Sequence, residues 1–197
     1  ANAEGDIWFG NLTVGPSGGF VAVNRIAAGE TEFRTRSTAL PRRTTNDQDK
    51  PMMTIDNSPS SPHYGRLYVA WNEFTDTFAI NVVVSMCDTR PGGGALDAAR
   101  CDESDNWSQP AELTDGGGSY IYADVAAGPD GTVYGVFWDF SSVNAIRGVS
   151  CAPASPCSTS AGWTPPKTIA QLDRNPNYDP DEVPFACPIR AQPGGRS

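Results

Sequence analysis

The sequence is poor in basic residues, in histidine and in long apolar runs. Only 14 Lys and Arg stand against 23 Asp and Glu, which gives a formal net charge of −9 over 197 residues. An acidic chain without a basic stripe makes few phosphate contacts, so we expect no nucleic-acid partner. No stretch approaches the roughly 20 apolar residues of a membrane-spanning helix, so we expect no membrane span.

Zinc ligands are also scarce, although cysteine is not. The single histidine, His63, and the lack of any Cys-x-x-Cys pair argue against a zinc site. Five cysteines are more than a cytosolic domain of this length usually carries, and disulfide bonds explain them better. Residues 1–6 lack a basic leader and an apolar run, as at a processed terminus. We therefore expect a secreted or extracellular surface protein.

Helical periodicity is almost absent from the chain, because Gly and Pro recur throughout (20 and 17 residues). Instead, short runs of β-branched and aromatic residues are bounded by Gly, Pro, Asn and Asp. Residues 67–71, 78–84 and 133–138 are examples. These are strand and turn signals, so the sequence predicts an all-β fold.

One pattern occurs twice in the same order. Residues 101–113 and 157–169 both read Cys, five residues, Trp, Ser or Thr, one residue, Pro, two residues and then Leu or Ile. Each copy follows a strand that ends in a cysteine, Cys87 or Cys151, and a hairpin arm that contains a tryptophan. Five shared features in one order indicate an internal repeat.

The repeat divides the chain into units of about four antiparallel strands. We expect three units, at residues 6–45, 49–113 and 120–170, and the start of a fourth at 183–197. Units of this size are typical of β-propeller blades, which bury their apolar faces against one another and close in rings of about 4 to 8. We interpret residues 1–197 as one partial β-propeller domain, whose further blades come from the same precursor or from another chain.

Two short motifs carry a resemblance to a known family. Residues 104–110 and 160–166 read Ser-x-x-Trp-Ser-x-Pro and Ser-Ala-Gly-Trp-Thr-x-Pro, and they resemble degenerate Asp boxes of sialidase-like (BNR-repeat) β-propellers. Residues 49–56 and 65–71 resemble bacterial secreted members. The resemblance implies a secreted or surface module for glycan or protein binding or for assembly, non-catalytic in this chain. The alternative is a sialidase-type glycoside hydrolase whose active site is completed by other sequence or another chain.

A sialidase holds its substrate carboxylate with arginines and uses a tyrosine, activated by a glutamate, as nucleophile. No such Tyr–Glu pair can be assigned from the sequence. The candidate ligand-binding residues are strand-associated arginines and acidic residues and one tryptophan outside the repeat: Arg25, Asp49, Arg66, Asp124 and Trp8. The competing interpretation makes the arginines surface or inter-blade partners of the acidic excess.

The other tryptophans recur at matching places in the repeat: Trp71, Trp107, Trp138 and Trp163. A ligand site is rarely repeated in register, whereas repeated aromatic residues in propellers usually pack between blades or close hairpins. We therefore expect these four to be structural.

A metal site has one candidate segment, residues 173–182. Asp179, Asp181 and Glu182 could supply oxygen ligands to calcium. The spacing fits no known calcium loop, and the prolines favour an extended linker. We expect no cofactor, with calcium as the alternative.

The repeat also predicts the disulfide pairing. Cys87 with Cys101, and Cys151 with Cys157, would each close the loop between the third and fourth strands of a blade. Cys187 is left over, which indicates a partner beyond the chain end or on another chain.

Overall fold

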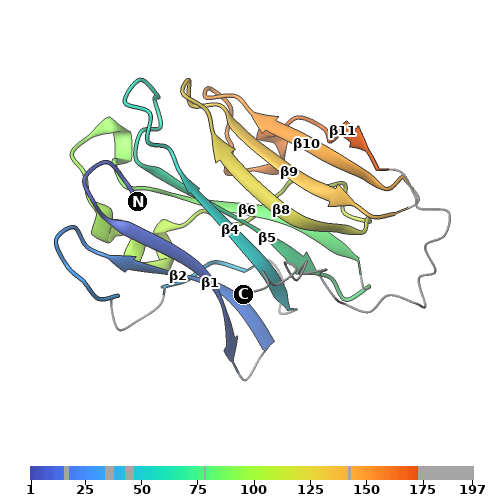
Figure 1. The fold of residues 1–197 in the computed structure, drawn as a ribbon, viewed down its shortest axis with the longest axis horizontal. Coiled ribbons are helices and arrows are strands. Elements are labelled where there is room, and N and C mark those ends of the chain that lie inside the picture. Colours follow the sequence, from blue (N-terminus) through green and yellow to red (C-terminus); the bar gives the residue numbers. More distant parts are fainter. Residues whose placement is uncertain (16–17, 34–37, 43–46, 78, 142, 173–197) are drawn as a thin grey trace, which may run out of the picture.

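Three antiparallel sheets follow one another along the chain and are stacked as layers (Figure 1). The computed structural model describes residues 1–15, 18–33, 38–42, 47–77, 79–141 and 143–172. Each sheet is a meander whose strands lie side by side in chain order, and none of the three closes on itself. The predicted all-β class is confirmed.

We name the sheets A, B and C in chain order. Sheet A contains β1 (Ile7–Gly15), β2 (Gly18–Ile26) and β3 (Thr38–Ala39). Sheet B contains β4 (Gln48–Ile55), β5 (Arg66–Phe74), β6 (Ile80–Asp88) and β7 (Ala111–Glu112). Sheet C contains β8 (Tyr120–Ala127), β9 (Val133–Asp139), β10 (Ala145–Cys151) and β11 (Lys167–Gln171). Four short 3-10 helices lie in the loops: η1 (Pro91–Gly93), η2 (Ala98–Asp102), η3 (Ser104–Asn106) and η4 (Ser160–Gly162).

The turn between β8 and β9 shows why Pro-Asp-Gly predicts a chain reversal. Gly131 has φ of 85°, a conformation that favours glycine, and its N–H donates to the carbonyl of Gly128 at 3.0 Å. The Asp130 carboxylate accepts from the backbone N–H of Thr132 at 2.9 Å. A Cβ at position 131 would also lie 2.6 Å from Ser61 Oγ, so the site requires glycine for its backbone and for space.

Sheet B is the middle layer and is buried on both faces. Its strands β5 and β6 each hold seven consecutive buried residues, which is why they read as continuous apolar runs in the sequence. Side chains on alternate positions pack toward opposite neighbours. Tyr68, Ala70, Val82 and Val84 share a core with sheet C, whereas Leu67, Val69, Trp71 and Val83 share a core with sheet A.

Sheets B and C match position by position. Leu67 pairs with Cys87 in sheet B, as Val133 pairs with Cys151 in sheet C. Both first strands then carry the same β-bulge, because the register shifts between Asp49 and Met52 and again between Ile121 and Asp124. The left-handed residue of each bulge is not a glycine: Lys50 has φ of 52° and Tyr122 has φ of 57°.

The cysteine–tryptophan motif also has one structure in both sheets. Disulfide bonds join Cys87 to Cys101 and Cys151 to Cys157, with Cα–Cα distances of 5.9 and 5.7 Å, in the pairing expected from the repeat. The indole N–H of Trp107 donates to the carbonyl of Cys101 at 3.0 Å. Trp163 makes the equivalent bond to Cys157 at 2.9 Å.

A hydroxyl group completes this motif. Ser108 Oγ accepts from the N–H of Met86 at 3.1 Å, and Thr164 Oγ1 accepts from the N–H of Ser150 at 2.9 Å. The pattern Cys, five residues, Trp, Ser or Thr thus encodes a loop whose indole and hydroxyl groups bind backbone groups. This requirement explains why these residue types recur.

The matching of Trp71 with Trp138 is wrong by one position. Trp71 corresponds to Phe137, and both point toward the preceding sheet. Trp138 corresponds to Asn72 and lies on the opposite face of sheet C, because a shift of one residue in a strand reverses the face.

Candidate functional site

The five predicted ligand-binding residues do not converge on one site. Arg25 and Trp8 lie opposite each other on sheet A, with Arg25 paired across the strands to Trp8. Asp49 and Arg66 belong to strands β4 and β5 of sheet B, and Asp124 belongs to β8 of sheet C. The five residues are therefore distributed over all three sheets.

Arg25 is a buried structural clamp. Its guanidinium binds Asp102 through two nitrogens, with the shortest bond at 2.7 Å, and binds Asp6 at 2.8 Å. Only 5% of Arg25 is exposed. The hydrogen bond with Asp102 raises the pKa of Arg25, burial opposes this, and the bond with Asp6 raises it further. With both edges of the guanidinium occupied, Arg25 has no free fork for a substrate carboxylate.

The clamp holds distant segments of the chain together. Asp102 immediately follows the disulfide-bonded Cys101, and its carbonyl accepts from Thr38 Oγ1 at 2.7 Å. Asp6 is bound in turn by the side-chain amide of Asn2 at 3.0 Å. The disulfide loop of sheet B is thereby fixed onto sheet A.

The other three candidates, Arg66, Asp49 and Asp124, each bind a neighbouring group of the protein itself. Arg66 Nη2 donates to Asp88 Oδ2 at 3.0 Å across strands β5 and β6. Asp49 accepts from the N–H and the ammonium group of its neighbour Lys50. Asp124 is exposed, and its carboxylate accepts from the N–H of Val125 at 2.8 Å. These contacts agree with the interpretation of the arginines as partners of the acidic excess.

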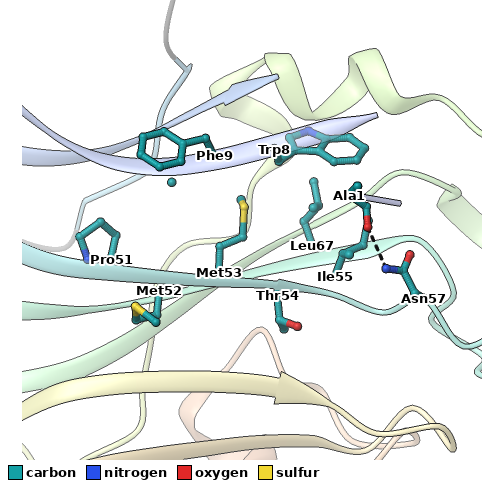
Figure 2. A pocket seen from close by; sticks show the side chains of 11 residues that line it. Ala1, Trp8, Phe9, Pro51, Met52, Met53, Thr54, Ile55, Asn57 and Leu67 are labelled. Carbon is teal, nitrogen blue, oxygen red and sulfur yellow. Dashed lines mark hydrogen bonds between the residues drawn. The ribbon is translucent and has the colours of Figure 1, made fainter. Parts of the chain in front are cut away.

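Trp8 lies in the core rather than free at the surface, with 9% of its area exposed. It also borders a cleft of about 430 Å³ between β1 and β4. Figure 2 shows Met53, Ile55 and Leu67 pointing across this cleft toward β1, whereas Met52 and Thr54 point away from it. Asn57 closes one end by donating to the carbonyl of Ala1 at 2.8 Å. The cleft is lined mainly by apolar side chains and contains no pair of carboxylates.

The outward face of sheet C carries exposed aromatic side chains. The rings of Tyr122 and Trp138 are nearly parallel, at 9°, with centroids 6.3 Å apart. Phe140 lies 5.7 Å from Trp138, and the indole N–H of Trp138 donates to Asn144 Oδ1 at 3.0 Å. A hollow of about 290 Å³ beside these rings is lined by Tyr122, Val136, Phe137, Trp138, Ile146 and Leu172. The sequence does not indicate this face, because the matching of Trp138 with Trp71 predicts a structural role for Trp138.

A tyrosine–glutamate pair also appears that the sequence did not reveal. Tyr64 Oη donates to Glu4 Oε1 at 3.1 Å, and Arg90 binds the same carboxylate oxygen at 2.5 Å. The Arg90 guanidinium lies 4.9 Å from the Tyr64 ring centroid. Desolvation, followed by the bond to Glu4, raises the pKa of Tyr64. Sixty positions separate the two residues, so no local pattern could have joined them.

The described part of the chain shows no group of three or more His, Cys, Asp or Glu side chains that could hold a metal ion. The calcium candidates Asp179, Asp181 and Glu182, the cysteine left over by the predicted pairing (Cys187) and the predicted fourth unit at 183–197 lie outside the described residues. No described helix has the length and apolar character needed to cross a bilayer.

Comparison with known proteins finds no matching family model, no matching curated protein and no matching solved structure.

Proposed function

We propose that this chain is a run of successive β-propeller blades, secreted or surface-exposed, that serves in glycan or protein binding or in assembly and not in catalysis. One observation carries the proposal: sheets B and C share the bulge, the disulfide, the tryptophan bond and the hydroxyl bond. Equivalent sheets that stack in chain order are the architecture of repeat proteins and propellers.

The stacking direction supports the same interpretation. Sheet B turns its Trp71 side to sheet A and its Tyr68 side to sheet C. Sheet C turns the equivalent Phe137 side back to sheet B. Sheet B therefore faces its predecessor and its successor with different sides, and sheet C faces its predecessor with the side equivalent to that of sheet B, as blades in a ring do. The two disulfide bonds suit an oxidising, extracellular environment.

The non-catalytic assignment rests on the state of Arg25. A sialidase-type site needs free arginines for the substrate carboxylate, and Arg25 is held by two carboxylates. A fluorogenic sialoside reporter tests this directly. We expect no release of fluorophore by the full chain, and turnover above the level of a heat-denatured sample would overturn the proposal.

Binding is tested with a glycan array and with light scattering. A lectin-like module binds glycans without turnover, whereas an assembly module forms particles larger than one chain without retaining glycans. Either outcome fits the proposal. A chain that remains monomeric and binds neither glycans nor proteins would contradict it.

The alternative, a sialidase-type glycoside hydrolase, is favoured by one observation, the hydrogen bond between Tyr64 and Glu4. The raised pKa of Tyr64 weakens this alternative, because a nucleophilic phenolate needs a lower pKa. If the reporter were cleaved, Tyr64→Phe would abolish cleavage in the hydrolase interpretation. Tyr134→Phe, at an exposed tyrosine outside this contact, is the control and would leave cleavage intact.

A further inference from the structure

The outward face of sheet C is apolar across its three main strands. Tyr134, Val136 and Trp138 of β9 point outward there, and Ile146 of β10 lies opposite Trp138. Tyr122 and Tyr134 are 59% and 49% exposed. Among the outward positions of β8, β9 and β10, only Asp124 is charged, in a chain with 37 charged residues (14 + 23). Large apolar faces with so little charge mark interaction surfaces.

The equivalent face of sheet B shows how such a surface is used. Tyr68 and Ala70 occupy the positions of Tyr134 and Val136, and both are fully buried beneath sheet C. Burial raises the pKa of Tyr68 to about 12, so its phenol stays neutral in that interface. Val82, the counterpart of Ile146, is 1% exposed. The outward face of sheet C thus has the composition of a face that another sheet covers.

At the other end of the stack, the outward side of sheet A combines large apolar side chains with a polar row in which Asn11 bonds Thr13 and Asn24. Ile7, Phe9, Phe20 and Ile26 lie on its outward side, since their strand neighbours Trp8, Val21 and Val23 face the core. Ile7 and Phe9 are 44% and 55% exposed, and Phe33 lies 6.1 Å from Phe9. None of the outward positions of β1 and β2 carries a charge. The outward sides of sheets A and C lie at opposite ends of the stack of described sheets (Figure 1).

We propose that the outward face of sheet C binds the outward face of sheet A of a second copy of this chain, head to tail. This inference rests on the proposed function, because it treats sheet A as a unit of the same kind as sheets B and C. In the stack, the successor side of one sheet always meets the predecessor side of the next. The only predecessor side left open among the described residues is the outward side of sheet A.

Head-to-tail contact also distinguishes this assembly from a simple twofold dimer. A twofold dimer would place the outward face of sheet C against itself, which brings two successor sides together and has no counterpart within the chain. A heterologous contact, in contrast, continues the existing A-to-B and B-to-C interfaces and yields either a closed ring or an open filament.

The test measures self-association by sedimentation velocity at concentrations up to about 100 μM, where micromolar complexes are populated. All proteins carry Cys187→Ser, so that cross-chain disulfides do not contribute. Phe9→Lys alters only the sheet A face, and Tyr134→Lys alters only the sheet C face. Gln109→Lys is the matched control, because Gln109 is exposed in a loop away from both faces.

We expect the parent and Gln109→Lys to associate with rising concentration. Each face variant alone should associate about tenfold more weakly or not at all, because its ammonium would be buried unpaired. An equimolar mixture of the two variants should form dimers and nothing larger, since each supplies one intact face.

Three results would overturn the inference: a parent that stays monomeric, a Phe9→Lys variant that dimerises as well as the parent, or a mixture that stays monomeric while the parent associates. Circular dichroism of each variant confirms that the fold is retained. The sialoside reporter distinguishes a failure of the proposed function from a failure of the second-copy contact. Turnover would remove the proposed function, whereas a monomer without turnover would remove only the second-copy contact.

Discussion

The ammonium group of Lys50 lies 5.4 Å from the ring centroid of Tyr122, and the two residues occupy the same left-handed position in consecutive sheets. The bulge residue of sheet B therefore contacts the equivalent bulge residue of sheet C. The bulge bends each first strand at the place where neighbouring sheets meet, and a cation–aromatic contact joins the two bulges.

Replacing Lys50 tests the backbone strain in this bulge. We expect Lys50→Gly to be more stable than Lys50→Ala by about 1 kcal/mol, because the left-handed conformation costs an L-residue about 1–2 kcal/mol. Urea unfolding of the two variants measures the difference. The same comparison at Thr54, an ordinary strand position in β4, should have the opposite sign. An alanine variant as stable as the glycine variant at position 50 would exclude strain there.

Removing Arg25 should be the most damaging change of a charged residue. Arg25→Met leaves Asp6 and Asp102 without their shared partner, and breaking a buried ion pair costs about 3–5 kcal/mol. Arg66→Met is the control, because the Arg66–Asp88 pair is more exposed and should contribute about 0–1 kcal/mol. Denaturant unfolding compares them, and equal losses would show that the clamp is not structural.

The two disulfide bonds should stabilise the protein to different degrees. Loop-closure entropy predicts a loss of about 3 kcal/mol for Cys87→Ala with Cys101→Ala and about 2 kcal/mol for Cys151→Ala with Cys157→Ala. The longer loop, whose cysteines are 14 positions apart in the sequence against 6 for the shorter, constrains the unfolded chain more. Denaturant unfolding of both double variants gives the order. A larger loss from the shorter loop would contradict this account.

Asp139 should make stability depend on pH in the acid range. Burial opposes ionisation of Asp139, but hydrogen bonds from Ser141 and Arg147 hold its pKa below the usual value. The unfolded chain binds this proton near pH 3.9, so the stabilisation is present above that pH and is lost as pH falls through the lower, folded-state pKa. Melting temperatures between pH 5 and 2 should therefore fall less steeply in Asp139→Asn. Parallel curves for variant and parent would assign the acid sensitivity to other groups.

Local sequence patterns were sufficient to predict the all-β class and the two disulfide pairs. Short runs of β-branched and aromatic residues, turn residues such as Gly131 and the Cys–Trp motif act over a few positions, so their structural consequences can be inferred from order alone. The motif around Trp107 and Trp163 is a clear case, because its indole N–H groups bind backbone carbonyls only six residues away.

Other features depended on the tertiary structure. Arg25 and Asp102 are 77 positions apart, and Tyr64 and Glu4 are 60 apart, so only the stacking of sheets brings them together. The face that Trp138 occupies was also decided there, because strand register fixes side-chain direction and a sequence alignment that slips by one residue reverses it. The sequence alone determined that repeated sheets form, since that depends on short-range periodicity. Which sides of those sheets are covered and which stay open was decided by packing between layers.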